Sequence, residues 1–225
     1  MTLLDPPSRK YYQLMASLPP MPAHFEVSRL PISGPRLEQR LRLLDERDLA
    51  TLERMRGRVF WERLRLELPE QQLVRELEAL LAEETNAIVR EVASSRMDTR
   101  TIVAALRRKR LGLGPPPAMG RWVDHIARHW SEPHFGLDHR YPWIPPLERA
   151  MAAGDVAEAD HIMIGIPWRH FTRLAQQHLF DFEAVVLYVA RWAVLNRWVS
   201  RDEAAGRQRV EQLFSEAIGE QARLF

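Results

Sequence analysis

The residues of this chain best suited to chemistry are its histidines, four of which fall between positions 125 and 139. His125 and His129 are four residues apart, a spacing that places two imidazoles on one helical face, as zinc and iron sites require. Glu158 and His161 match one half of the Glu-x-x-His motif of di-iron helical bundles, but that chemistry needs a second half, which the sequence lacks. No Glu follows His125, so the His-Glu-x-x-His motif of metalloproteases is also absent. The sequence therefore predicts no bound metal and leaves a metal-dependent helical-bundle enzyme as an alternative function.

A run of cations follows one predicted helix. It comprises Arg96, Arg100, Arg107, Arg108, Lys109 and Arg110. Such a stripe could neutralise phosphates, but its last four members lie at the helix C-terminus, where the helix dipole favours positive charge. The formal net charge is only +2, and no recognised nucleic-acid-binding pattern accompanies the stripe. We therefore expect no nucleic-acid partner, keep a nucleic-acid-binding adaptor as an alternative, and predict a protein-binding surface at Arg100, Arg107, Arg108, Lys109 and Arg110.

Other catalytic signatures are missing from the sequence. The chain has no cysteine, which excludes disulfides, thiolate zinc sites, iron–sulfur clusters and a cysteine nucleophile. It has neither a Gly-Lys-Ser/Thr phosphate loop nor a Gly-x-Ser-x-Gly elbow, and Gly112-Leu113-Gly114 is followed by prolines rather than by a third glycine. We therefore predict a protein that is not an enzyme, holds no cofactor and works through contact.

Composition indicates a compact helical protein of one or two domains. Of its 225 residues, 46% are hydrophobic and 28% are charged. The sequence pI of about 9.3 reflects arginine, which stays protonated and replaces lysine everywhere except at Lys10 and Lys109. The longest apolar run, Ala184 to Ala190, is 7 residues long, against about 20 for a membrane-spanning helix. With no signal peptide at the N-terminus, we expect a cytoplasmic protein with no direct membrane span.

Helical periodicity and prolines divide the first half of the chain. The expected segments are a proline-rich arm over 11–35 with a short helix or strand at 11–18, one kinked helix or two over 36–66, a helix over 70–93, and a helix from Ser95 or Asp98 to Leu111. Glycines and prolines over 112–117 are typical of a linker, so we predict two helical halves, 1–113 and 114–225.

The second half also reads as helices separated by loops. The predicted helices are 121–130, 147–153, 156–164, 168–177, 182–199 and 202–225. Gly154 is predicted to end one of them, and Asp155 and Asp181 are predicted to cap the starts of two others. The run 161–168 is β-like but short. We therefore predict an all-α protein, an irregular multi-helix bundle with a proline-rich N-terminal arm.

Three stretches of the sequence resemble a known family. They are Tyr11-Tyr12-Gln13-Leu14-Met15-Ala16-Ser17-Leu18-Pro19-Pro20, the segment from Met97-Asp98-Thr99-Arg100 to Leu113, and Phe182 to Trp192 with Asn196-Arg197-Trp198. Together they resemble the short bacterial proteins of unassigned function that accompany V-type ATPases. Those proteins look like divergent relatives of the C-type subunit of rotary V/A-type ATPases, which corresponds to the d-type subunit of the eukaryotic enzymes.

The resemblance implies a mechanical function. The C-type subunit is a funnel-like, all-helical cap on the cytoplasmic face of the membrane proteolipid ring, and it receives the tip of the central rotor shaft. The implied partners are therefore the central-stalk subunits and the proteolipid ring of a rotary ATPase, and the implied location is the inner face of the membrane. The C-type subunit has three related helical units, whereas this chain has room for about two. The cations of 100–110 would form part of the contact surface.

Overall fold

The computed structural model describes residues 10–59, 70–116 and 120–221. Within these ranges the chain forms nine α-helices, one short 3-10 helix and no strand, which confirms the predicted all-α bundle. In chain order the helices are α1 (Tyr12–Ser17), α2 (Gly34–Leu41), α3 (Glu46–Val59), α4 (Glu70–Glu83), α5 (Ala87–Arg110), α6 (Val123–Arg128), the 3-10 helix (Pro133–Gly136), α7 (Ile144–Ala153), α8 (Val156–Ala175) and α9 (Phe182–Gln221). The likeness to the funnel-like cap of rotary ATPases stays a prediction.

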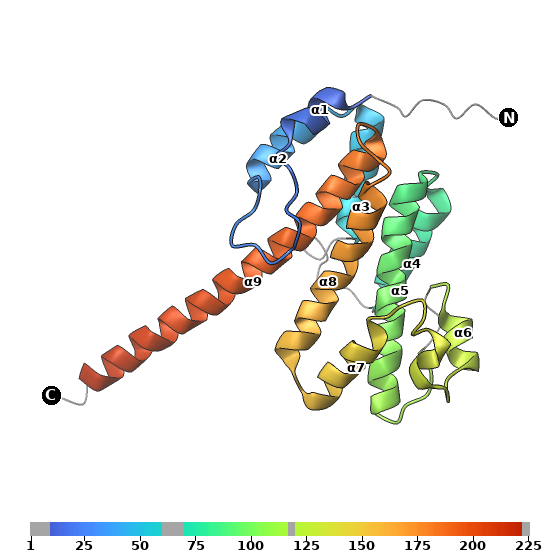
Figure 1. The fold of residues 1–225 in the computed structure, drawn as a ribbon, viewed down its shortest axis with the longest axis vertical. Coiled ribbons are helices and arrows are strands. Elements are labelled where there is room, and N and C mark those ends of the chain that lie inside the picture. Colours follow the sequence, from blue (N-terminus) through green and yellow to red (C-terminus); the bar gives the residue numbers. More distant parts are fainter. Residues whose placement is uncertain (1–9, 60–69, 117–119, 222–225) are drawn as a thin grey trace.

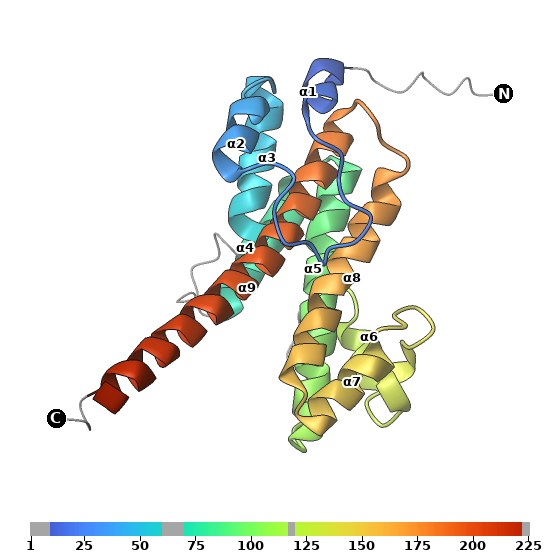
Figure 2. The same ribbon diagram turned by 60° about the vertical axis from the view of Figure 1, so that its left-hand side comes forward.

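Five helices lie side by side and form the body of the molecule (Figure 1): α3, α4, α5, α8 and the first half of α9. Helices α6 and α7 lie at one end of α5, and α1 and α2 lie at the opposite end of the body (Figure 2). Helix α9 continues past its neighbours in both views. In the described part of the chain, we find no helix that combines the length and the apolar character needed to cross a bilayer.

Two clusters of buried apolar side chains form the core, and α5 and α8 contribute to both. The larger cluster contains side chains from helices α1, α2, α3, α4 and α9, from the arm and from the first half of α5. The smaller cluster contains side chains from α6, α7 and the second half of α5. Val92 and Ile102 lie on α5 in different clusters, and both are 0% exposed. Residues 112–116 lead from α5 toward α6, and the predicted division of the chain at residue 113 stays a prediction.

Helix α5 begins earlier than the sequence suggested. A single helix over 70–93 and a new start at Ser95 or Asp98 are both wrong, because the chain breaks at 84–86 and then runs unbroken for 24 residues. Asn86 caps the start, since its Oδ1 accepts hydrogen bonds from the Ile88 and Val89 amides at 3.0 and 3.1 Å. Ser95 instead bonds back to the Val92 carbonyl, inside the helix.

Helix α8 is also continuous where two helices were expected. Asp155 caps it as predicted, accepting from the Glu158 amide at 3.0 Å. The helix then passes through Pro167, and the β-like run 161–168 is helical. A proline inside a helix removes one backbone hydrogen bond. Ile164 and Trp168, which are 2% and 5% exposed, pack into the larger cluster on either side of Pro167, and this burial holds the helix together.

Helix α9 begins at its predicted cap, where Asp181 Oδ1 accepts from the Ala184 amide at 2.8 Å. Its first turns are buried from Ala184 to Ala190, as the apolar run predicted. The expected boundary between helices 182–199 and 202–225 is wrong, because one helix runs to Gln221. Residues 222–225 lie outside the described residues.

The proline-rich arm between α1 and α2 forms no helix, as predicted, and contacts α9. Trp192 donates its indole N–H to the Ile32 carbonyl at 2.8 Å, and Tyr188 donates its hydroxyl to the Pro19 carbonyl at 3.0 Å. Burial raises the pKa of Tyr188 to about 12, so its hydroxyl remains a donor at neutral pH. Phe25 adds an edge-on ring contact with Trp198 at 5.1 Å between centroids. The arm is therefore part of the fold.

Removal of the α9 cap tests this account of the fold. We expect Asp181→Ala to lower the free energy of unfolding by about 1 kcal/mol, because the Ala184 amide loses its acceptor. Asp181→Asn keeps an oxygen acceptor and should retain most of the stability. Urea unfolding of the three proteins measures the difference, and equal losses in the Ala and Asn variants would contradict capping.

Candidate functional site

Three of the five predicted contact cations bind the protein's own backbone. Arg108 Nε donates to the Gly114 carbonyl at 2.7 Å, and Lys109 Nζ donates to the Glu132 carbonyl at 2.6 Å. Arg110 Nη1 donates to the carbonyl of Met151 near the end of α7. Arg108 thus binds the chain just after α5, whereas Lys109 and Arg110 attach the segments near α6 and α7 to the end of α5. Of the other two, Arg107 is exposed and Arg100 is partly buried.

Lys109 supports a strained segment of backbone. His134 and Phe135 have φ values of 51° and 59°, in the left-handed region that residues other than glycine rarely adopt. Phe135 is nevertheless 0% exposed, and its ring stacks on Trp130 with centroids 5.3 Å apart. The Lys109 ammonium lies 4.9 Å from the Phe135 ring centroid. Burial of Phe135 offsets the backbone strain, so we assign this segment a role in the fold.

The histidine pair on α6 is engaged in local contacts. The rings of His125 and His129 lie 4.3 Å apart, centroid to centroid. His125 Nε2 is 3.0 Å from the Phe135 carbonyl, and His129 Nδ1 is 2.8 Å from Glu132 Oε1. His161 pairs instead with Glu26 in the arm, at 2.9 Å. These residues and Glu158 therefore do not converge on one point.

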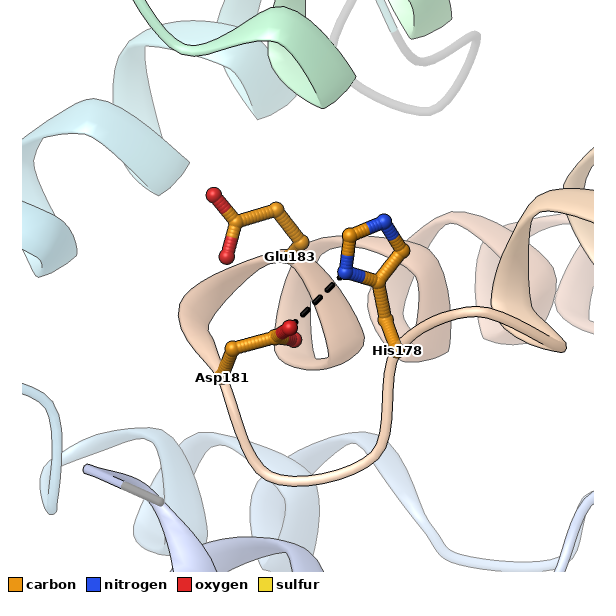
Figure 3. A group of neighbouring side chains, drawn as sticks. All are labelled: His178, Asp181 and Glu183. Carbon is orange, nitrogen blue, oxygen red and sulfur yellow. Dashed lines mark hydrogen bonds and ion pairs between the residues drawn. The ribbon is translucent and has the colours of Figure 1, made fainter. Parts of the chain in front are cut away.

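A different group has ligand atoms within 4.8 Å of one another: His178, Asp181 and Glu183 (Figure 3). His178 Nδ1 is 2.8 Å from Asp181 Oδ2, and the other Asp181 oxygen caps α9. Glu183 Oε1 accepts from the Asn86 side-chain amide at 2.7 Å, which links α9 to the start of α5. Each of the three groups thus has a structural role without a metal.

A cavity lies between α5, α8 and the segment before α7. Its volume is about 510 Å³. At its wall, Asp98 on α5 is 2% exposed, and its Oδ2 accepts from Arg121 Nε at 2.8 Å and from the Tyr141 hydroxyl at 2.9 Å. Arg121 Nη2 lies 2.6 Å from the same oxygen. Asp98 therefore links α5 to the segments before α6 and α7.

A second chain of contacts crosses the cavity wall between α5 and α8. His170 Nε2 lies 3.1 Å from Glu91 Oε1, and Arg173 Nη2 lies 3.2 Å from His170 Nδ1. His170, with further contributions from Arg121 and Arg140, lowers the pKa of Glu91. The cavity wall therefore holds Glu91 as a carboxylate.

Arg96 adds an uncommon buried cation to the same wall. Its Nε and Nη2 atoms are buried, although the side chain as a whole is partly exposed. Burial, together with the charges of Arg197 and Arg100, lowers the pKa of Arg96 well below its usual value. Arg96 thus lines the cavity and lies near two further cations.

The sequence reasoning did not identify this cavity. The sequence predicts a helix start at Ser95 or Asp98, although a carboxylate within the apolar face of a helix is itself a signal of a buried partner. Arg169 and Arg173 share one face of α8 at a four-residue spacing, but Pro167 led to a predicted break before them. The partners of Asp98, which are Arg121 and Tyr141, lie on distant segments, which spacing does not reveal.

Comparison with known proteins assigns no family. No family model matches the chain, and neither a curated protein nor a solved structure matches it.

The pH dependence of stability tests the Glu91 contact. Because the folded-state pKa of Glu91 is lowered, the unfolded chain takes up this proton first as pH falls. The contribution of Glu91 is therefore present above the unfolded pKa of about 4.3 and is lost as pH falls through the folded pKa. We expect the stability difference between wild type and Glu91→Gln to shrink between about pH 5 and pH 3.

Urea unfolding across this pH range measures the effect. Glu46→Gln, which changes an exposed carboxylate on α3, is the matched control. A Glu91→Gln difference that stays constant with pH would contradict the assignment.

The Asp98 link makes a separate prediction. Arg121→Met should lower the free energy of unfolding by about 2–3 kcal/mol, because a buried carboxylate loses a charged donor. Adding Asp98→Asn should recover part of that loss, since the buried charge is then removed. Arg128→Met is the control, because Arg128 is exposed and donates to the Asp124 carbonyl of its own helix at 3.2 Å. Equal stabilities for Arg121→Met and Arg128→Met would show that the link contributes little.

Proposed function

We propose that this chain is a non-catalytic adaptor protein of a V/A-type rotary ATPase, coupling central-stalk subunits to the membrane proteolipid ring. The proposal starts from the resemblance of residues 11–20 and 97–113 to the proteins that accompany V-type ATPases. An adaptor of this kind transmits force through contacts, so it needs a rigid frame and an exposed surface that a protein partner recognises.

The observation that carries the proposal is the exposed surface where the 97–113 segment ends. Leu111 and Leu113, just after α5, are 71% and 47% exposed, and Val156 at the start of α8 is 79% exposed. Arg107 and Arg110 are exposed beside them. We call these five residues the contact end. Apolar side chains bordered by charges are typical of protein-binding surfaces.

The two parts of the contact end belong to one region of the molecule. The end of α5 and the turn between α7 and α8 lie side by side in Figures 1 and 2. The Arg110 side chain joins them through its hydrogen bond to the Met151 carbonyl. Because α5 is also buried in both apolar clusters, a load on the contact end would reach the whole body.

The surface variant must spare the cations that hold the fold. Arg108, Lys109 and Arg110 each bind a backbone carbonyl, so reversing their charges would also disturb neighbouring segments. We therefore choose Arg107→Glu/Leu111→Ser/Val156→Ser. The matched control, Arg42→Glu/Leu43→Ser/Leu179→Ser, also changes one exposed arginine and two exposed apolar residues, at positions elsewhere.

Affinity purification from native membranes, with mass-spectrometric identification of partners, tests the proposal. We expect the wild type and the control to retain rotary ATPase subunits and the contact-end variant to lose them at least about tenfold, equivalent to about 1.4 kcal/mol. Absence of rotary ATPase subunits with the wild type would contradict the proposed function. Equal retention by the contact-end variant would contradict the assignment of the surface.

A further inference from the structure

The cavity between α5 and α8 has a strongly basic lining. Among the described residues that line it are five arginines and one histidine, against two carboxylates. The arginines are Arg96, Arg121, Arg140, Arg169 and Arg173. Both carboxylates already have cationic or polar partners, because Asp98 accepts from Arg121 and Tyr141, and Glu91 contacts His170. The lining therefore carries more basic than acidic side chains, among them the exposed Arg140, Arg169 and Arg173.

One acceptor in the cavity wall also needs a donor. Asp98 Oδ2 accepts the hydrogen bonds of Arg121 and Tyr141, whereas Asp98 Oδ1 is buried with no hydrogen-bond partner among the described residues. A buried carboxylate oxygen without a donor is costly, so such atoms usually have a bound partner. A ligand hydroxyl that reached this oxygen from the cavity would supply the donor at the α5 wall.

The remaining lining suits an organic molecule better than a bare ion. Tyr141, Trp143, Ile166 and Phe171 contribute apolar and aromatic surface to the cavity. A volume of about 510 Å³ also exceeds what a single phosphate ion fills, and it falls within the roughly 300–1,000 Å³ typical of small-molecule sites. Arginines, apolar side chains and the hydrogen-bond acceptor Asp98 thus line the same cavity.

We propose that this cavity binds a small organic phosphate that carries a hydroxyl group. Arginine is suited to phosphate because its planar guanidinium donates in pairs to phosphate oxygens. Arg169 and Arg173, which are exposed on α8, bind the phosphate, and Asp98 Oδ1 accepts from the ligand hydroxyl. This inference does not depend on the adaptor function, because the contact end shares none of these residues.

Calorimetric titration of the full chain with three related probes tests each part of the site. Glycerol 2-phosphate carries the phosphate and hydroxyl groups, inorganic phosphate lacks the hydroxyls, and glycerol lacks the charge. We expect saturable binding of glycerol 2-phosphate, at least about tenfold weaker binding of inorganic phosphate, and no measurable binding of glycerol. Absence of saturable binding of glycerol 2-phosphate to the wild type would overturn the proposal.

Variants of exposed cavity cations locate the binding. Arg169→Gln and Arg173→Gln, made singly, should each weaken glycerol 2-phosphate binding at least about tenfold. Arg128→Gln removes an exposed arginine on α6, which does not line the cavity, and should leave binding unchanged. Equal weakening by Arg128→Gln would indicate general attraction of anions and would overturn the site. Inorganic phosphate that binds as tightly as glycerol 2-phosphate would overturn the role of Asp98.

Discussion

Helix α5 carries buried side chains from Val89 to Leu106 and supplies them to both apolar clusters, and this shared burial positions everything attached to it. Its start is joined to α9 through Asn86 and Glu183. Its middle carries Asp98, which holds the segments before α6 and α7. Its end carries Lys109 and Arg110, which bind the backbone near α6 and α7. The cavity and the contact end therefore both include residues of α5.

Arginine has two separate uses in this protein. Some arginines, such as Arg108 and Arg110, donate to backbone carbonyls and hold loops, a role that suits a cation whose charge does not depend on pH. Others, such as Arg169 and Arg173, gather around the cavity on the exposed side of α8. The net charge of +2 does not reveal either use. Basic and acidic residues are nearly equal in number over the chain, whereas basic residues outnumber acidic ones in the cavity lining.

Local signals in the sequence predicted much of the fold. The caps Asp155 and Asp181, the left-handed Gly154 and the proline-rich arm all lie where their chemistry placed them, because each acts within a few residues of itself. The errors occur where a distant partner decides the conformation. Aspartate is a residue type that often caps helices, but the Asp98 carboxylate instead accepts hydrogen bonds from Arg121 and Tyr141.

The candidate sites were less predictable than the fold. The cations of α5 were found from sequence, but three of them bind carbonyls on other segments, as Arg110 does 41 residues away. The cavity joins residues from Glu91 to Arg173, so its chemistry exists only after folding. Helix α8 contributes to the cavity because it continues past Pro167, held by the buried side chains on either side. Proline alone would predict that the helix breaks there.

Amide hydrogen exchange along α5 tests the central claim that one unbroken helix is shared by both clusters. We expect the amides between about residues 92 and 106, including those of Ser95 to Asp98, to exchange together and only through global unfolding. Markedly faster exchange at Ser95 to Asp98 than on either side would show a break at the middle of the helix. That result would contradict the account, because the two clusters would then be free to move independently.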